Sequence, residues 1–242
     1  MLSIIVPIYN SQKYLLRFFE YIHALFSKEG IEYEIVFVDD CSTDSSWQII
    51  RTLHSVHPGI IKGIQLSSNF GQHMAIFQGF AYVSGNVVIT SDVVLHVPQE
   101  KLIELYNLLL TSESDFTYLS FQRHYPDFVL NAMSNAFNLV YHGIVGVSSN
   151  GSNYRALKKD TFNRLLQYNF DYGFIDTFLF LNARGLAVST VHLPGLFKDS
   201  GYTYMKKINQ AMRVLFMSLI RRIWGFNYTK GNSSQSIVSR CL

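Results

Sequence analysis

The chain has 242 residues, of which 48% are hydrophobic and 15% are charged, and its formal net charge is +3. This length suits one sizeable α/β domain with a small appendage rather than several domains. The small net charge gives no support for nucleic-acid binding, so we expect no nucleic-acid partner. The sequence has no run of about 18 apolar residues without a charge, so we expect no membrane-spanning helix. Two cysteines make no disulfide framework and no signal-peptide pattern is visible, so we expect a cytoplasmic protein.

The first 90 residues predict alternating strands and helices. The second strand, residues 33–38, has a continuous apolar run of the kind that is buried on both faces of a parallel sheet. Thr43 or Ser42 can cap the helix that follows it. The alternation predicts an α/β fold with a mainly parallel, doubly wound sheet and helices on both of its faces. The predicted strands are residues 2–6, 33–38, 60–66 and 86–90, and the predicted helices are residues 12–27, 43–53 and 72–83.

Polar side chains follow these strands at the points where the strands end. Open α/β sheets bind ligands at the carboxyl ends of their strands, so we expect these side chains to form one ligand site. Two adjacent carboxylates are costly to bury unless hydrogen-bond donors or a cation offset them, which favours a nucleoside or a metal-bound phosphate as their partner. The side chains are those of Tyr9, Asn10, Asp39, Asp40, Asn69 and Asp92.

After residue 100 the alternation becomes less regular. Residues 129–145 are rich in aromatic side chains and predict one helix or a pair of helices. No internal repeat is visible in this part of the chain or in the rest of it. The other predicted helices are residues 101–110, 160–167 and 173–182, and the predicted strands are residues 116–121, 152–157 and 187–192.

Residues 204–224 predict an amphipathic, basic helix at the end of a 1–203 domain. Its apolar side chains form one stripe, and five lysine and arginine side chains accompany them. Such a helix can lie in the bilayer interface, or it can pack on the core as a terminal helix, and both interpretations stay open. The predicted organisation is therefore a domain at residues 1–203, the helical segment at 204–229 and a polar, flexible tail at 230–242.

Three sequence blocks resemble family-two inverting glycosyltransferases of the GT-A fold. Among these enzymes, the blocks are most similar to polyprenyl-phosphate sugar transferases of the dolichol-phosphate mannose synthase type. Each block alone is a weak signal, but three in this order and spacing are specific. The resemblance extends over residues 2–208 and implies a Rossmann-like GT-A sheet. The blocks are Ser-Ile-Ile-Val-Pro-Ile-Tyr-Asn at 3–10, Val-Asp-Asp-Cys-Ser-Thr-Asp-Ser-Ser-Trp at 38–47 and Leu-Ser-Ser-Asn-Phe-Gly-Gln-His at 66–73.

The resemblance implies a nucleotide-sugar donor site at the strand ends. Tyr9, on a turn that Pro7 stiffens, offers a flat surface for the nucleobase, and Asp40 can accept a hydrogen bond from a ring N–H group. Asp39 can reach the ribose or tie down the same loop. Asp39 and Asp44 can instead cap turns and helices, and we favour capping for Asp44. The remaining residues assigned to donor binding are Asn10, Asn69, Gln72 and Arg155.

A divalent cation, Mg²⁺ or Mn²⁺, is also implied, because the family holds one with an Asp-x-Asp motif. Here the first acid is Asp92, and Val94 stands in place of the second. A lone carboxylate is a weak site for either cation, although His96 or His192 can add a ligand to Mn²⁺. Two further departures from the family pattern, Ser68 and Gly195, also remove groups suited to a diphosphate.

Asp92 and Asp176 are the predicted catalytic residues. Asp176 matches the position of an acceptor-side acid that can act as a general base, although an acid at the start of a helix can also simply interact with the helix dipole. A polyprenyl phosphate is already ionised and needs no strong base. In that case Arg155 and Arg123 are candidates to hold the phosphate.

The sequence therefore predicts a glycosyltransferase that moves a sugar, with inversion, from a nucleotide sugar to a glycan or a polyprenyl phosphate. We expect it at the inner face of the membrane, bound peripherally through residues 204–224, in cell-wall or polysaccharide biosynthesis. A homo-oligomer is compatible with the sequence. The alternative is a catalytically impaired binding or scaffold subunit, which Ser68, Val94 and Gly195 favour.

Overall fold

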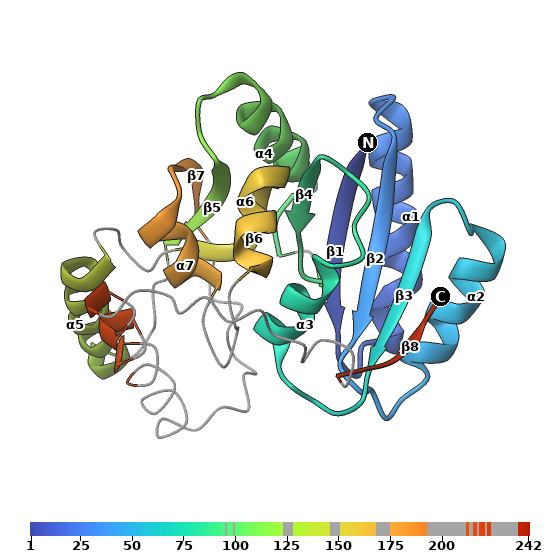
Figure 1. Cartoon of the computed structure of the whole chain (residues 1–242), viewed down its shortest axis with the longest axis horizontal. Helices are drawn as coiled ribbons and strands as arrows, with labels where there is room; N and C mark the ends of the chain where they lie inside the picture. The colour runs from blue at the N-terminus through green and yellow to red at the C-terminus, as the bar shows by residue number, and fades with distance from the viewer. Residues whose placement is uncertain are drawn as a thin grey trace.

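The computed structural model describes residues 1–94, 96–98, 100–122, 128–145, 151–167, 175–192 and 237–242, together with 212, 215–216, 218–220 and 222–223. The described strands form one sheet in the order β7-β5-β6-β4-β1-β2-β3-β8 (Figure 1). This mostly parallel sheet with helices on both faces confirms the predicted α/β class. The strands are β1 (Leu2–Ile8), β2 (Tyr33–Asp39), β3 (Ile61–Leu66), β4 (Val87–Thr90), β5 (Phe116–Gln122), β6 (Gly151–Lys158), β7 (Gly185–His192) and β8 (Val238–Cys241).

Two apolar clusters cover the two faces of the sheet. The side chains of β2 alternate between them, since Ile35 and Phe37 belong to one cluster and Val36 and Val38 to the other. This double burial explains why the sequence of β2 shows a continuous apolar run. One face packs against α1 (Gln12–Lys28), α2 (Ser46–Val56) and α4 (Glu100–Thr111), and the other against α3 (Gln72–Gly79), α6 (Lys159–Leu166) and α7 (Ile175–Asn182).

Helix α3 lies unusually close to the sheet. It ends at Gly79, whereas the apolar pattern predicts a helix that continues to residue 83. A Cβ atom at Gly79 would lie 2.7 Å from Cγ2 of Ile5 in β1, so only glycine permits this approach. The short helix and its close packing fix the position of the α3 N-terminus at the carboxyl ends of the strands.

The direction of β6 is the main feature of the sheet that the sequence pattern does not reveal. β4 pairs with β6 antiparallel, and Thr90 lies opposite Arg155. β6 also pairs antiparallel with β5, which runs parallel to β7. Because β6 runs against its neighbours, its residues 153–155 come to lie beside the carboxyl end of β4.

Part of the predicted flexible tail forms a strand instead. β8 pairs antiparallel with the edge strand β3, and the N–H group of Leu242 donates to the carbonyl oxygen of Gly63 at 2.7 Å. Leu242 packs against the core, where a Cβ atom at Gly63 would lie 3.2 Å from it. The prediction of a flexible tail is therefore wrong for residues 237–242, because polar composition does not show a strand edge available for pairing. Residues 230–236 lie outside the described part of the chain.

The described residues between 212 and 223 are helical and lie beside α5 (Phe128–Val145) (Figure 1). The Arg222 guanidinium donates to the carbonyl oxygens of Gly143, at 2.7 Å, and Ile144 at the end of α5. The Ser218 hydroxyl lies 3.0 Å from the hydroxyl of Thr177 in α7. One side of the predicted amphipathic segment therefore packs on the domain. Residues 204–211 and 224–229 of this segment are outside the described residues, so its limits stay a prediction.

The opposite side of this segment is exposed and apolar. The fractional exposure is 63% for Phe216 and 67% for Ile223, and Leu139 on the neighbouring α5 is 76% exposed. The predicted single apolar stripe is thus divided between an inner and an outer side. No helix among the described residues has the length and apolar character that crossing a bilayer requires.

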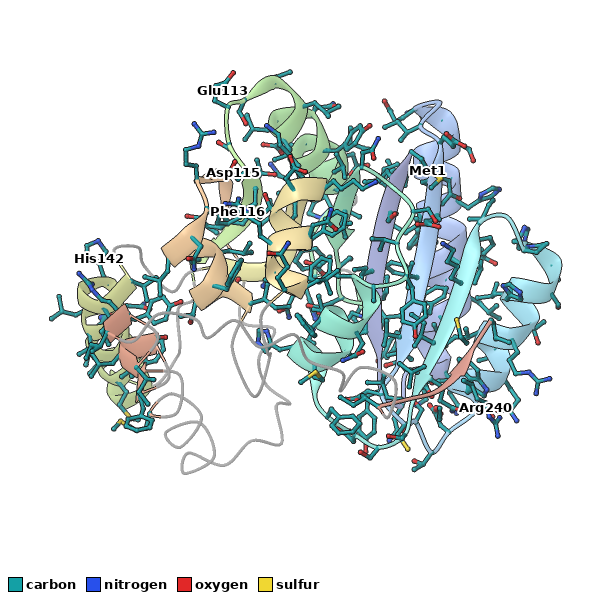
Figure 2. The ribbon with its side chains drawn as sticks, viewed as in Figure 1. Met1, Glu113, Asp115, Phe116, His142 and Arg240 are labelled. Atoms are coloured by element: carbon teal, nitrogen blue, oxygen red, sulfur yellow. The ribbon has the colours of Figure 1, made fainter. Side chains whose placement is uncertain are left out.

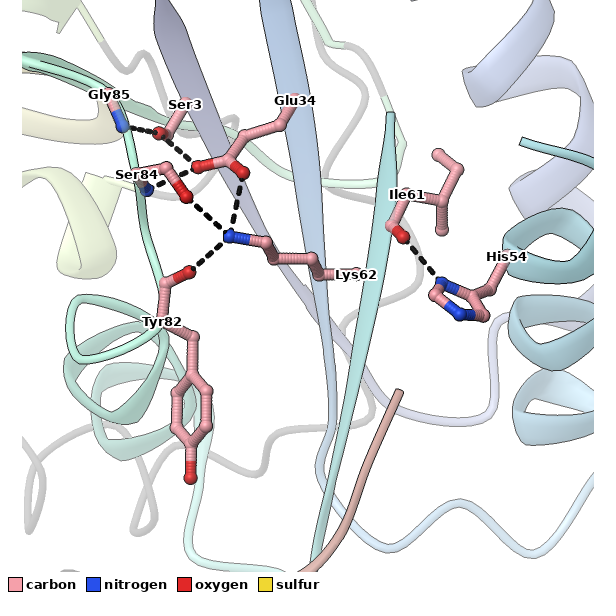
Figure 3. A network of polar contacts seen from close by, with 8 residues as sticks. All are labelled: Ser3, Glu34, His54, Ile61, Lys62, Tyr82, Ser84 and Gly85. Atoms are coloured by element: carbon pink, nitrogen blue, oxygen red, sulfur yellow. Dashed lines mark hydrogen bonds and ion pairs between the residues drawn. The ribbon is translucent and has the colours of Figure 1, made fainter. Parts of the chain in front are cut away.

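A polar network ties the amino ends of the central strands together (Figure 3). Glu34 is 3% exposed, accepts a hydrogen bond from the Ser3 hydroxyl at 2.6 Å and pairs with the Lys62 ammonium at 2.8 Å. Lys62 also donates to the hydroxyl of Ser84 and the carbonyl oxygen of Tyr82. Burial raises the pKa of Glu34, but the bonds from Lys62, Ser3 and Ser84 outweigh burial and leave the pKa below its ordinary value.

We expect Glu34→Gln to lower the free energy of unfolding by about 1–3 kcal/mol near neutral pH, because it removes a charge from this network. A carboxyl group with a lowered folded-state pKa stabilises the fold above its unfolded pKa, and this contribution is lost as the pH falls through the folded pKa. The two proteins should therefore differ fully above the unfolded pKa of a glutamate, about 4.3, and converge as the pH falls through the lowered folded-state pKa of Glu34. Urea unfolding at several pH values measures this. In the matched control Glu104→Gln, which breaks the partly exposed pair with Lys101, the change should stay below about 1 kcal/mol.

Candidate functional site

A cavity of about 320 Å³ opens at the carboxyl ends of β1, β2 and β4. Five of the ten residues that the sequence assigned to donor binding, metal binding or catalysis line this cavity. Asn10, Asp39, Asn69, Arg155 and Asp176 do not line it. Its walls are Pro7, Ile8, Tyr9, Ser11, Asp40, Gln72, Asp92, Val93, Val94 and His96.

Tyr9 follows β1 and is 49% exposed, which leaves its ring available to a ligand. Asn10 has a left-handed backbone with φ 48°, a conformation that asparagine tolerates better than most residues. Its side-chain oxygen accepts a hydrogen bond from the Thr43 N–H at 2.8 Å, and its own N–H donates to the Ser42 hydroxyl at 3.0 Å. Asn10 therefore joins the β1–α1 and β2–α2 loops and sets the place of Tyr9.

Asp44 caps two helices. It accepts hydrogen bonds from the N–H of Gln12 at 3.1 Å and from the N–H of Ser46 at 2.9 Å, at the first residues of α1 and α2. The capping interpretation of Asp44 is therefore confirmed. α2 starts at Ser46, later than a cap at Thr43 or Ser42 predicts, because Asp44 provides the cap.

Asp40 is almost fully buried and holds the loop between β3 and α3. Its two oxygens accept hydrogen bonds from the N–H groups of Phe70 and Gly71, each at 2.8 Å. Burial raises the pKa of Asp40 above its ordinary value. The two N–H groups lower the pKa in part, and the negative charge of Asp39 raises it. A carboxylate oxygen has a second lone pair, so Asp40 can still accept a hydrogen bond from a ligand in the cavity.

Asp39 is fully buried below the cavity. One of its oxygens accepts hydrogen bonds from the Gln65 amide at 3.0 Å and from the Ser42 N–H at 3.4 Å. This geometry supports the loop-tying interpretation, whereas contact with a ribose stays a prediction. Asn69 is exposed on the loop that Asp40 holds, and its role in binding also stays a prediction.

Asp92 lies two residues after the end of β4 and is fixed from two sides. Its Oδ1 accepts hydrogen bonds from the Gln72 amide at 2.5 Å and from the Asn153 amide at 3.2 Å. Burial raises the pKa of Asp92, while His96, the two amides and Arg155 oppose the increase. Among the described contacts, both of these bonds use Oδ1, so Oδ2 is the oxygen that remains for a ligand.

Val94 and His96 occupy the same loop as Asp92. The Val94 side chain is half-buried and packs against the core, which a carboxylate could not do without cost. His96 is exposed and lines the cavity with Asp92. Within the described residues, no cluster of three or more His, Cys, Asp or Glu side chains is suited to a metal ion. The His192 side chain, Arg123 and Gly195 lie outside what the structure describes.

Arg155 and Asp176, which the sequence assigned to different roles, form an ion pair. Arg155 Nη2 lies 2.8 Å from Asp176 Oδ1, and the Arg155 side chain is fully buried. Asp176 lies in the first turn of α7, so the pair joins β6 to α7. Phosphate binding by Arg155 and base catalysis by Asp176 both stay predictions.

Sequence reasoning missed two residues near this pair. Asn153 was not expected to hold Asp92, although its position two residues before Arg155 on a strand places both side chains on one face. His73 in α3 is the other residue. Burial lowers the pKa of His73 to about 4. The negative charge of Asp176 raises the pKa, and the positive charge of Arg155 lowers it. His73 is therefore neutral near pH 7.

Comparisons with known proteins agree with this geometry. The sequence model of glycosyl transferase family 2 matches residues 3–183. A curated undecaprenyl-phosphate 4-deoxy-4-formamido-L-arabinose transferase from Photorhabdus laumondii is 30% identical over 212 residues, which are 86% of this chain and 64% of that protein. The protein of the same description from Shewanella sediminis is 31% identical, with 86% and 63% covered. The chain thus spans less than two thirds of these relatives.

Solved structures support the fold. The crystal structure of S. aureus TarS 1-349 with UDP-GlcNAc has a TM-score of 0.58 at 20% identity and covers 90% of this chain and 66% of that one. Glucosyl-3-phosphoglycerate synthase from Mycobacterium tuberculosis, in complex with Mn²⁺, UDP and glucosyl-3-phosphoglycerate, has a TM-score of 0.60 at 18% identity, with 92% and 79% covered. These similarities confirm the predicted GT-A fold.

The ion pair of Arg155 and Asp176 should show strong energetic coupling. We expect Arg155→Met and Asp176→Asn each to destabilise the fold by about 3–5 kcal/mol, because each leaves the partner without its full counter-charge. The double variant should lose clearly less than the sum of the two. Urea unfolding of the four proteins measures this cycle.

The matched control is the cycle of Asp115 with Arg184. This pair is 3.7 Å apart, and the Arg184 side chain is 71% exposed. Asp115 lies at the end of the sheet where β1 and β5 begin, the same end as Met1 (Figure 2). Its coupling should stay below about 1 kcal/mol. Equal coupling in the two cycles would contradict the prediction.

Proposed function

The chain belongs to glycosyl transferase family 2, and we propose that it transfers a sugar from a nucleotide-sugar donor to a polyprenyl phosphate at the inner face of a membrane. The observation that carries this proposal is the cavity at the strand ends. It combines an exposed aromatic ring, Tyr9, with two carboxylates, Asp40 and Asp92, within a space of about 320 Å³. Ligand sites in open α/β sheets lie at these strand ends.

In the proposed complex the nucleobase stacks on Tyr9, and a ring N–H donates to Asp40. Two backbone N–H groups hold Asp40, so its carboxylate accepts the hydrogen bond of the base from a fixed position. The diphosphate then lies toward Asp92 and His96. The oxygen of Asp92 and the imidazole of His96 are a donor set that suits Mn²⁺, which would neutralise the charge of the diphosphate. Gln72 keeps the Asp92 carboxylate oriented.

The reaction is a direct displacement. An acceptor oxygen attacks the anomeric carbon on the face opposite the diphosphate and forms a new C–O bond. The bond from that carbon to the diphosphate oxygen breaks, and the nucleoside diphosphate leaves with the electron pair. A phosphate monoester brings an ionised oxygen, so no proton has to be removed. For a hydroxyl acceptor, Asp176 would take the proton, with Arg155 as the positioning residue that orients it.

The acceptor class is inferred from the curated relatives, whose names include undecaprenyl phosphate. A lipid acceptor requires the enzyme at a bilayer surface. The outer sides of α5 and of the described residues between 212 and 223 suit such a contact, because their apolar side chains are exposed. This apolar face comprises Leu139, Val140, Met212, Phe216, Leu219 and Ile223. A glycan acceptor remains the second candidate.

A scaffold subunit without turnover has less support. Val94 removes one acid of the family motif, but Tyr9, Asp40, Asp92 and Gln72 line one cavity, as donor binding requires. The fixed orientation of Asp92 would have little use in a protein that only binds another protein. We therefore favour an enzyme.

Calorimetry with UDP, GDP and dTDP tests the donor site. We expect at least one of them to bind, and Asp40→Asn to weaken that binding at least about ten-fold, because a hydrogen bond to a charged group contributes about 1.5–3 kcal/mol. The control Asp115→Asn removes an acid at the other end of the sheet and should leave the affinity unchanged. If none of the three nucleotides binds, neither the enzyme nor the scaffold version of the proposal holds. If one nucleotide binds, hydrolysis of the matching sugar nucleotide distinguishes the two versions, because only the enzyme should hydrolyse it.

Sedimentation with vesicles of anionic and neutral phospholipid tests the membrane contact. Phe216→Glu and Leu139→Glu should each reduce the bound fraction several-fold, because each places a charge where apolar surface meets the acyl boundary. Leu110→Glu is the matched control, since Leu110 is also exposed, at 56%, but lies on α4. Equal loss in all three variants would contradict a specific contact face.

A further inference from the structure

Tyr154 in β6 holds the loop that forms one wall of the cavity. Its side chain is fully buried, and its hydroxyl makes two hydrogen bonds to the backbone of this loop. It donates to the carbonyl oxygen of Val94 at 3.1 Å and accepts from the N–H group of His96 at 3.1 Å. A tyrosine hydroxyl has one hydrogen to donate and lone pairs to accept with, so both bonds can exist together.

The loop needs such support because β4 stops early. β4 ends at Thr90, and four residues that line the cavity, Asp92, Val93, Val94 and His96, come after the strand. These four described residues therefore have no ladder of strand hydrogen bonds to fix them. The cavity has the shape described here only if something else holds this part of the backbone.

β6 provides the support through two successive residues, Asn153 and Tyr154. The Thr90 hydroxyl donates to the carbonyl oxygen of Asn153, and the Asn153 amide donates to Asp92. Tyr154 then fastens the loop at Val94 and His96, and the next residue along β6, Arg155, pairs with Asp176. The antiparallel direction of β6 places these residues beside the end of β4.

We propose that Tyr154 is a positioning residue for donor binding, which sets the 92–96 loop in its binding conformation before any ligand arrives. The side chain of Val94 packs on the core while its carbonyl oxygen is bound by Tyr154, so this position is anchored on both sides. Asp92 and His96 are thereby presented to the cavity by the protein itself. A site that is already ordered loses less entropy on binding.

The binding test uses Tyr154→Phe and the matched control Tyr33→Phe. Tyr33 is also a buried tyrosine with a bonded hydroxyl, 2.6 Å from Nδ1 of His23, but it lies at the start of β2, away from the cavity. Titration with the best-binding nucleotide among UDP, GDP and dTDP should show about ten-fold weaker binding for Tyr154→Phe, and a change within about two-fold for Tyr33→Phe. This binding test rests on the proposed function, because it needs a nucleotide that binds. If nucleotide binds and the two variants have equal affinity, the positioning role is wrong.

The second test needs no ligand and so is independent of the proposed function. Amide hydrogen exchange of the ligand-free protein, followed by NMR, should show protection of the His96 N–H, although His96 is exposed. Tyr154→Phe should remove this protection, and Tyr33→Phe should keep it. Unprotected exchange at His96 in the unsubstituted protein would overturn the proposal, even if Tyr154→Phe does not fold.

Discussion

A carboxylate that is buried must be surrounded by hydrogen-bond donors, and the ligand face of this protein is built around that requirement. Each acid at the strand ends takes its donors from another segment and so ties two segments together. Asp40 binds the loop after β3, Asp44 binds the starts of α1 and α2, and Asp92 joins α3 to β6. Asp176 joins α7 to β6 in the same way. The walls of the cavity are therefore fixed by the side chains that give it its charge.

The acids both hold the loops and give the cavity its charge, and the two parts of the site differ in how their loops are held. Around Tyr9 and Asp40, the loops are fastened by many backbone donors, and an aromatic ring and an acceptor face the cavity. Around Asp92, Val94 stands where the resemblance predicts a second acid, and its partly buried side chain packs against the core. The protein holds the loop there with the Tyr154 hydroxyl and the Asn153 amide instead of an additional charge. A smaller negative charge also lowers the repulsion that an incoming diphosphate would meet.

Much of this arrangement could be predicted from the sequence. The apolar run of β2 and the polar residues after each strand gave the parallel sheet and its ligand edge, because both depend on local pattern. The antiparallel direction of β6 could not be predicted, since strand periodicity is the same in either direction. The hydrogen bonds of Tyr154 were missed for a related reason: the partners of a buried hydroxyl depend on which segments meet, over a separation of about 60 residues. β8 was missed because a polar composition predicts disorder until a free strand edge is available.

The pairing of β8 with β3 also has a consequence for how the chain reaches its fold. Ser239 donates to the carbonyl oxygen of Gln65, and these partners are 174 residues apart. During synthesis β3 emerges early, but the strand that covers its outer edge follows only after the rest of the sheet has been made. For that period, the N–H and C=O groups of this edge are open to pairing with other chains. Until β8 is made, pairing of the β3 edge with other chains therefore competes with correct folding.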